Sequence, residues 1–389
     1  MAGDALDLLV ASRSCFVSIN RAPYRELAKR GLRVAIVVPR ELTFGGHPQK
    51  AEPREADDPP IYELESTGGH GRLWTFRGIR NVLRRNSPRI VLLDTDPGSR
   101  LSIEVGLYQR MRKRKTACIS CDNMPHTLLG ELRRGPRDGA KFLAARALSR
   151  LSASVVDHVF CLTSDILDVN RRKGFDSHLS IMRLGFDPAI FFPDARVRDS
   201  RRHELGIASA PCIGYFGRIS QEKGLHVLLG ALELLLDLDW FLLLDRFTTY
   251  GSQYAEQMRA QIQERLGGRV REFDASHSEI ASYMNATDIV VVPSISSPGA
   301  KEQYGRVVPE AMACGNVLVV SNSGALPEIA GDAAVIVPEG SAQELARELR
   351  KLLTNENLRR AYSSRSVIRA QAFTISQQAK QLLDVFRTW

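Results

Sequence analysis

Two segments in the second half of the chain carry the residues best suited to chemistry. The first, Gly214-Tyr-Phe-Gly-Arg-Ile-Ser-Gln-Glu-Lys-Gly224, places Arg218 and Lys223 five residues apart. An apolar run precedes it and a helical pattern follows, so we expect a turn at the carboxyl end of a strand, where open α/β sheets bind ligands. Glycine permits close backbone approach, Arg can hold phosphate oxygens with two N–H groups, and Lys adds a point charge. The pattern favours a diphosphate site; ordinary surface cations after a strand are the alternative.

The second segment, Glu302-Gln-Tyr-Gly-Arg-Val-Val-Pro-Glu310, holds two carboxylates eight positions apart and continues Ala-Met-Ala-Cys-Gly. The residues 307–314 are expected to form a helix, because Pro309 is tolerated in a first turn and Gly315 is a good terminator. Glu302 would then lie in the preceding loop and Glu310 near the helix start, where free N–H groups favour an anion. The simpler interpretations are a loop charge and a favourable first-turn acid.

Composition limits the class of protein. The chain has 389 residues, 44% hydrophobic and 25% charged, which indicates a globular protein of two or three domains and excludes a disordered, collagen-like or disulfide-stapled chain. No apolar run is long and uncharged enough to predict a transmembrane helix. The acids Asp4 and Asp7, without a basic segment, argue against a signal peptide, so we expect a cytoplasmic protein. The six cysteines lie mostly in apolar runs and are expected to be buried thiols.

Positive charge is concentrated in one region. The net charge is +9, but residues 71–150 hold 18 Lys/Arg against 6 Asp/Glu, a local charge of +12. Such a region can meet a nucleic acid, an anionic membrane surface or an acidic substrate, or can simply be solvated. Aromatic residues are few there, which argues against base stacking, so no nucleic acid is expected and an anionic lipid surface is favoured. The clusters are Arg77/Arg80/Arg84/Arg85/Arg89, Arg110/Arg112/Lys113/Arg114/Lys115 and Arg133/Arg134/Arg137/Lys141/Arg146/Arg150.

Strand and helix patterns alternate through both halves, which predicts an α/β fold with two doubly wound parallel sheets. Residues 45–60 are expected to be a loop, and 184–194 with the polar residues after them an interdomain linker. In the first half, strands are expected at 6–11, 32–39, 89–94, 116–120 and 155–162, and helices at 22–29 and 138–151. In the second half, strands are expected at 212–217, 240–245, 269–273, 289–294, 317–322 and 334–337, and helices at 224–236, 252–266 and 278–285.

These segments resemble the retaining glycosyltransferases of family 4, which have the GT-B fold. The resemblance covers nearly the whole C-terminal half: residues 184–194, 214–225, 302–315, 323–329 (Ser-Gly-Ala-Leu-Pro-Glu-Ile) and the tail 373–386. The N-terminal half resembles the family mainly in its βαβ pattern. The resemblance implies two Rossmann-like domains with a cleft between them. They are an acceptor-side domain over 1–185 and a nucleotide-sugar domain over 186–372, with a helix over 373–389 crossing back to the first.

The resemblance also implies roles. Arg218 and Lys223 would bind the diphosphate of a UDP- or GDP-sugar, Glu310 the ribose hydroxyls, and Glu302 the sugar hydroxyls. Gly217, Tyr304, Gly305 and Arg306 complete the expected donor-binding set. Transfer would retain the anomeric configuration, with the leaving phosphate taking the acceptor's proton. No metal or other cofactor is expected, because two cations already stabilise the leaving group. The acceptor would be a glycan or lipid-linked sugar in cell-surface polysaccharide synthesis, and the enzyme peripheral on the inner face of the membrane.

The chain departs from the family pattern in three places. The usual Gly-Gly loop after the first strand is replaced by the residues 12–21, and the Gly-rich turn after 240–245 by Asp245-Arg-Phe-Thr-Thr249. Where the family often has a catalytic-cleft histidine, this chain has Cys121-Asp122-Asn123, with His126 just beyond. Asp122 and His126 are the candidates for that role; a histidine on the cleft rim is the alternative.

Other interpretations stay open. Asp94-Thr-Asp96 and Asp237-Leu-Asp239 match the D-x-D of metal-dependent transferases, although the first fits an acceptor contact better. Cys118 and Cys121 have half the spacing of a zinc site, but no second pair completes it, which favours plain thiols. The rival functions are a glycoside hydrolase using Glu302 and Glu310, and a non-catalytic basic protein binding nucleic acid or anionic lipid.

Overall fold

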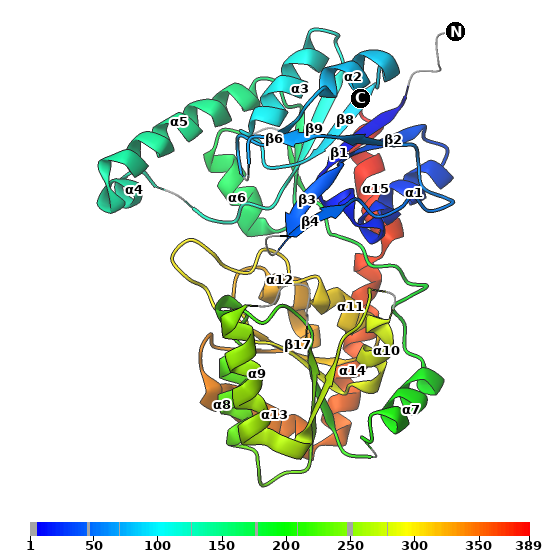
Figure 1. Cartoon of the computed structure of the whole chain (residues 1–389), viewed down its shortest axis with the longest axis vertical. Helices are drawn as coiled ribbons and strands as arrows, with labels where there is room; N and C mark the ends of the chain where they lie inside the picture. Colours follow the sequence, from blue (N-terminus) through cyan, green and yellow to red (C-terminus); the bar gives the residue numbers. More distant parts are fainter. Residues whose placement is uncertain are drawn as a thin grey trace. The chain divides into compact units, whose positions relative to one another are not determined.

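The computed structural model describes residues 6–44, 47–69, 71–125, 127–175, 178–207, 209–246, 252–277 and 279–389. They form two compact units, Met1–Gly185 with Ile375–Trp389, and Phe186–Thr374. Each unit is a parallel β-sheet covered by helices (Figure 1). None of the helices among these residues is long and apolar enough to cross a membrane.

The first unit is built on a seven-stranded sheet in the order β11-β10-β9-β8-β1-β2-β5, in which every neighbouring pair is parallel. Its central strands are continuous apolar runs because helices cover both faces of a parallel sheet. The strands are β1 (Leu8–Ser12), β2 (Val34–Pro39), β5 (Ile61–Leu64), β8 (Ile90–Asp94), β9 (Lys115–Ser120), β10 (His158–Cys161) and β11 (Leu179–Ile181). Two short strands, β6 (Ser66–Thr67) and β7 (Thr75–Phe76), pair beside it.

The helices of this unit include one from the end of the chain. The expected tail helix forms as α15 (Ile375–Phe386) and packs against α1 (Ala22–Lys29). Its apolar side is buried, and Phe386 meets Phe160 edge to face at 6.1 Å between ring centroids. The other helices are α2 (Ile79–Asn86), α3 (Arg100–Arg110), α4 (Leu128–Arg134), α5 (Pro136–Ala153) and α6 (Ser164–Arg172).

The second unit is a six-stranded parallel sheet in the order β14-β13-β12-β15-β16-β17. Trp240 is fully buried at the entrance to β13 and donates its indole N–H to the Leu235 carbonyl at 2.7 Å. The strands are β12 (Cys212–Tyr215), β13 (Phe241–Asp245), β14 (Val270–Phe273), β15 (Ile289–Val292), β16 (Val317–Ser321) and β17 (Ala334–Val337). The helices are α7 (Ala195–Glu204), α8 (Leu225–Glu233), α9 (Gln253–Leu266), α10 (Ile280–Ala286), α11 (Val307–Ala313), α12 (Leu326–Ala330), α13 (Ala342–Thr354) and α14 (Glu356–Ala370).

The expected loop over 45–60 was wrong in its first part. Residues His47–Lys50 form β4, which pairs antiparallel with β3 (Glu41–Phe44). The side chains of Pro48, Gln49 and Lys50 are exposed, so this strand buries no apolar face. A strand without apolar alternation gives no periodic signal to read.

The polar residues after 184–194, which were expected to belong to the linker, form the helix α7. Asp194 caps it by accepting hydrogen bonds from the N–H groups of Arg196 and Val197. Charge replaces an apolar face here, because Arg198 and Arg202 both pair with Asp288, at 2.6 and 3.2 Å. A helix attached by ion pairs shows little hydrophobic periodicity, which explains why its sequence resembled a linker.

A buried guanidinium fixes the loop that follows β1. Arg21 is fully buried and lies 3.0 Å from the Asp58 carboxylate, which is also buried. Its remaining N–H groups satisfy backbone oxygens on both sides of the loop. The acceptors are the carbonyls of Cys15, Phe16, Glu52 and Pro53.

We expect Arg21→Met to lower the free energy of unfolding of the first unit by about 3 kcal/mol, because it leaves Asp58 and four carbonyls without their shared donor. Arg33→Gln is the matched control, since Arg33 pairs with Asp7 at 3.0 Å at the surface and should cost less than about 1 kcal/mol. Hydrogen exchange resolved along the chain during urea titration separates the two units. Equal losses for the two variants would contradict this account of the loop.

Candidate active site

The order of strands reverses between β12 and β15 in the second unit. From β12 the chain moves outward through β13 and β14, then returns to place β15 on the other side of β12. Ligands bind open α/β sheets at such a switch point, outside the carboxyl ends of the strands. The turn 216–224 leaves β12 there, and the residues 293–306 leave β15. Both chemistry-bearing segments of the sequence therefore begin at the switch point.

The two segments meet in an ion pair. Lys223 Nζ lies 2.6 Å from Glu302 Oε2, and Ser294 Oγ donates to the same oxygen at 2.8 Å. The Glu302 side chain is only 9% exposed, so its charge needs these partners. The structure thus brings together Lys223 and Glu302 as a fixed ammonium–carboxylate unit. Ser294 was missed from the sequence, where a single serine after a strand carries no signal.

Two glycines make the Lys223–Glu302 ion pair possible, because each lets two backbone segments approach closely. Gly224 has φ +70°, and a Cβ there would lie 1.9 Å from the Pro293 carbonyl oxygen. Gly324 has φ +51°, and a Cβ there would lie 2.1 Å from the Glu302 carbonyl oxygen, which also accepts a hydrogen bond from Ala325 N at 3.0 Å. Any side chain at either position would push the ion pair apart, since the obstructing atoms are backbone.

Glu310 stands in the first turn of α11, as expected. Burial raises the pKa of its carboxyl to about 7, and the nearby positive charge of Arg306 acts in the opposite direction. Near neutral pH the group therefore exists in both protonation states.

The other expected donor-binding residues line the same two segments. Gly217 and Arg218 follow β12, and the Arg218 carbonyl accepts a hydrogen bond from the Tyr215 hydroxyl at 2.9 Å. Tyr304 is buried, and Gly305 has φ +75°, with its carbonyl accepting from Val308 N at 2.9 Å. Their backbone groups are thus fixed between the ion pair and α11. Arg306 directly precedes that helix.

The first unit repeats the switch-point arrangement between β1 and β8. A hollow of about 270 Å³ lies at the carboxyl ends of these strands and β9. Asp94 accepts hydrogen bonds from the hydroxyls of Ser12 and Ser14, and Asp96 accepts from Ser120 Oγ at 2.6 Å and from two backbone N–H groups. Both carboxylates of the D-x-D triplet are thus anchored beside the hollow by protein groups.

Asp122 also lines this hollow, but it is paired. Lys173 Nζ lies 2.8 Å from its carboxylate and Arg72 Nη2 lies 3.8 Å away. Burial raises the pKa of Asp122, but the Lys173 charge and hydrogen bond outweigh it, and the pKa ends below its usual value. Asp122 is therefore a charged hydrogen-bond acceptor rather than a proton store. His126, the other candidate for this role, lies outside the described residues.

Three residues of the hollow were missed as site residues: Arg13, Arg72 and Trp74. Trp74 is 5% exposed, and its indole Nε1 is buried without a hydrogen-bond partner in the described part of the chain. The Nη1 of Arg72 is likewise buried and has no hydrogen-bond partner among the described residues. Two buried donors at one hollow suit a ligand with oxygen acceptors. The only sequence signal for these residues is the group of glycines before Arg72, which would let the backbone come close to a ligand.

Among the described residues, no group of three or more His, Cys, Asp or Glu side chains is arranged to hold a metal ion. All six cysteines are free thiols, and every one except Cys121 is buried. Burial raises the pKa values of Cys118 and Cys121, so both are protonated near neutral pH. The C-x-x-C pair thus behaves as two packing residues.

The family comparison decides what the second unit is. Residues 197–367 match the family model described as "Glycosyl transferases group 1". The second unit belongs to this family. A D-inositol 3-phosphate glycosyltransferase of Corynebacterium urealyticum is 28% identical over 250 residues, 60% of this chain and 58% of the relative. An alpha-maltose-1-phosphate synthase of Mycolicibacterium smegmatis is 27% identical over 64% of this chain and 67% of its own length. The chain spans little more than half the length of most curated relatives it matches.

Solved structures show that the whole chain has the GT-B fold, with two Rossmann-like domains. Anabaena HepE in complex with UDP and glucose has a TM-score of 0.72 at 18% identity, covering 99% of this chain and 100% of its own. The sucrose-phosphate synthase of Thermosynechococcus elongatus has a TM-score of 0.70 at 18% identity, covering 98% of each chain. At such identities the likeness shows the fold alone.

The raised pKa of Glu310 predicts a pH dependence of stability. Between the unfolded-state value near 4.5 and the folded value near 7, the folded chain holds more protons, so its stability falls as pH rises through this window. We expect Glu310→Gln to remove about 2 kcal/mol of that fall. Urea titrations from pH 5 to pH 8 measure it. Glu356→Gln, at an exposed helix start, is the control, and an unchanged slope in Glu310→Gln would contradict the assignment.

Proposed function

We propose that the chain is a retaining glycosyltransferase that moves a sugar from a UDP- or GDP-sugar to a hydroxyl of a glycan or lipid-linked acceptor. One observation carries the proposal: Lys223, Glu302 and Ser294 converge at the switch point of a unit that belongs to the group 1 glycosyltransferases. No metal or other cofactor is needed in this scheme, because protein cations meet the departing diphosphate.

Charge development explains the two cations. As the glycosidic bond to the diphosphate breaks, the sugar gains oxocarbenium character and the leaving group gains negative charge. Arg218 and Lys223 would stabilise that charge in the transition state more than in the bound substrate, which lowers the barrier. Lys223 has three N–H donors and gives one to Glu302, so the others remain for phosphate oxygens.

Glu302 then has two tasks. Its Oε2 fixes the Lys223 ammonium, while the carboxylate as a whole can accept hydrogen bonds from hydroxyls of the transferred sugar. Such contacts would tie the sugar's position to that of the diphosphate. Glu310 would accept hydrogen bonds from the ribose hydroxyls, and its ionised form would bind them best. The leaving phosphate itself would take the proton of the attacking hydroxyl, which delivers the sugar with retained configuration.

The hollow of the first unit suits a hydroxylated acceptor. Arg72 and Trp74 offer N–H donors, while Asp94 and Asp122 offer carboxylate acceptors, and a sugar ring needs both. A second candidate acceptor is a phosphorylated polyol. Two relatives are named for acting on inositol 3-phosphate and for making maltose 1-phosphate, and Arg13 and Arg72 border the hollow. The positive charge of the region 71–150 favours a role in polysaccharide synthesis at the cytoplasmic face of a membrane.

The rival hydrolase scheme fits the geometry less well. Its nucleophile or acid would be Glu302, whose Oε2 is already engaged by Lys223 and Ser294. A hydrolase also gives no role to Arg218 and Lys223, since its leaving group carries no diphosphate. A purely binding protein would give no role to the Glu302 ion pair.

Nucleotide binding tests the diphosphate site. We expect UDP or GDP to bind without added metal, and Lys223→Met to weaken binding tenfold or more, because a charge-assisted hydrogen bond is lost. Arg218→Gln should act in the same direction. Isothermal titration calorimetry with UDP, GDP and ADP measures this, with the exposed Lys351→Met as control. Absence of binding by every nucleotide, or equal affinity of Lys223→Met and wild type, would refute the site.

The stereochemical outcome tests the transfer. A mass-spectrometric screen of α-linked UDP- and GDP-sugars against glycan, lipid-linked and polyol-phosphate acceptors identifies the productive pair. We expect the product to keep the α configuration, read from the anomeric proton coupling by NMR. Glu302→Gln should lower kcat/KM at least a hundredfold, since it disturbs both the sugar and Lys223. A β-linked product would exclude retention, and free sugar as the main product would support the hydrolase.

A further inference from the structure

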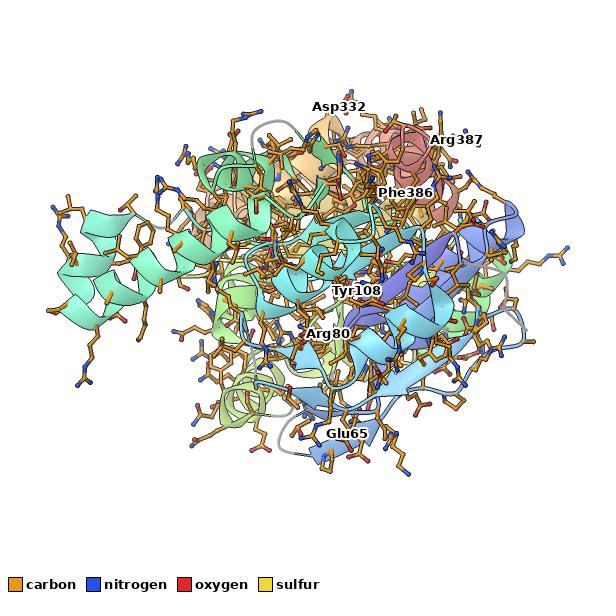
Figure 2. All side chains as sticks on the ribbon, turned by 90° about the horizontal axis from the view of Figure 1, so that it is seen from above. Glu65, Arg80, Tyr108, Asp332, Phe386 and Arg387 are labelled. Carbon is orange, nitrogen blue, oxygen red and sulfur yellow. The ribbon has the colours of Figure 1, made fainter. Side chains whose placement is uncertain are left out.

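The helices α4 and α5 form a hairpin that extends away from the sheet of the first unit, in both Figure 1 and Figure 2 (turquoise). α5 is 18 residues long, yet its fully buried residues are only Gly139, Ser149 and Ser152. Gly139 lies against Leu132 of α4, and Ser152 lies against Ser102 of α3, at 3.3 Å between hydroxyls. Small contacts thus anchor a helix whose outer face meets solvent.

That outer face carries an apolar stripe, which we name the α5 stripe. It consists of Ala140, Leu143, Ala144, Ala147 and Leu151, all exposed and spaced as one side of a helix. Leu143 and Leu151 are 53% and 45% exposed. On α4, the side chains of Leu129 and Leu132 are 64% and 48% exposed. Exposed leucines gathered on one projecting element are unusual for a surface that meets only water.

Cations border the α5 stripe. At about 100° per residue, Arg146 and Arg150 fall along one edge and Arg137 and Lys141 along the other. Arg146 and Arg150 are exposed and form no ion pair with any described residue. The hairpin residues 127–153 contain six Lys/Arg and two Asp/Glu, a net charge of +4. An apolar stripe between cations has the amphipathic pattern of a helix lying in a membrane interface.

The other basic clusters show less of this combination. At the end of α3, Leu107 and Met111 are exposed beside Arg110 and Arg112, but they are two side chains at a helix end and form no stripe. On α2, Arg84 and Arg85 are exposed, but the apolar residues Ile79, Val82 and Leu83 are buried in the unit. After α3, the Arg112 guanidinium stacks on the Tyr108 ring at 3.8 Å, and the Nη1 of Arg114 is buried. Figure 2 labels Arg80 and Tyr108 on these two helices, apart from the hairpin. The charge of the region 71–150 is therefore paired with exposed apolar surface most fully on α4 and α5.

We propose that the α4–α5 hairpin docks the protein on an anionic lipid bilayer, with the α5 stripe at the boundary of headgroups and acyl chains. Arg146 and Arg150 reach phosphate groups from one edge and Arg137 and Lys141 from the other, while their stems cover apolar surface. This deepens the proposed function, on which it rests for its biological purpose, by naming the surface that meets the acceptor's membrane. The binding itself does not require catalysis.

Vesicle sedimentation of the full chain tests the docking surface. We expect binding to vesicles of 70% phosphatidylcholine and 30% phosphatidylglycerol at 0.1 M NaCl, little binding to pure phosphatidylcholine, and release at 0.5 M NaCl. Arg146→Gln with Arg150→Gln should lower the partition coefficient about tenfold or more, since each cation near the surface contributes about fivefold. Leu143→Ser with Leu151→Ser should lower it to a similar degree, because apolar burial is lost.

Matched controls separate docking from general charge. Arg84→Gln with Arg85→Gln removes the same charge from α2, and Ile368→Ser removes an exposed apolar side chain from α14. Both should change partitioning less than twofold, and circular dichroism checks that every variant is folded. Equal loss in the Arg84/Arg85 and Arg146/Arg150 variants, no loss on removing the leucines, or duplex DNA binding in place of vesicle binding would overturn the proposal.

Nucleotide titration keeps this test distinct from that of the proposed function. The hairpin variants should bind UDP or GDP as the wild type does. Vesicle binding that depends on the α5 stripe would support docking even in a chain that bound no nucleotide. Nucleotide binding without vesicle binding would refute docking and leave the proposed function standing.

Discussion

The candidate active site depends on one buried ion pair, between Lys223 and Glu302. A carboxylate that is nine-tenths buried is stable as an anion only with close partners, and Lys223 and Ser294 supply them. Those partners stand on segments that leave different strands, so the pair exists only where the two segments touch. Gly224 and Gly324 make that contact possible, because no Cβ fits at either position. The chemistry of the unit is thus a consequence of close backbone packing at a switch point.

The same topology gives the first unit a different kind of site. Its switch point has no comparable glycine-locked ion pair among the described residues; serine hydroxyls and backbone N–H groups hold Asp94 and Asp96 instead. Arg72 and Trp74 add donors whose hydrogen-bonding capacity is unspent. A set of acceptors and donors near charge balance is suited to hydroxyl groups, whereas a paired ammonium beside Arg218 is suited to phosphate. In the proposed function, the second unit would bind the nucleotide-sugar and the first unit the acceptor.

Features that depend on residues close together in the sequence could be predicted, and features that depend on contacts between distant segments could not. The buried parallel strands were predictable because both faces are covered, as in Val34–Pro39 and Val317–Ser321, which appear as unbroken apolar runs. Lys223, Glu302 and Glu310 could be named as candidates because each belongs to a motif of fixed spacing. Ser294 and Trp74 were not, since their roles arise from contacts between segments distant in sequence.

Burial and pairing also decide which charges are available, and a sequence count cannot supply that. Within the region 71–150, Arg112 stacks on an aromatic ring and Lys115 pairs with Asp157 at 2.9 Å, whereas Arg146 and Arg150 are exposed residues of α5. A uniform +12 region thus resolves into cations engaged within the unit and cations that border exposed leucines. Only the second kind combines electrostatic attraction with apolar burial, and membrane docking needs both, because either term alone gives weak, easily reversed binding. The fold therefore selects one functional surface from a charge distribution that the sequence shows as continuous.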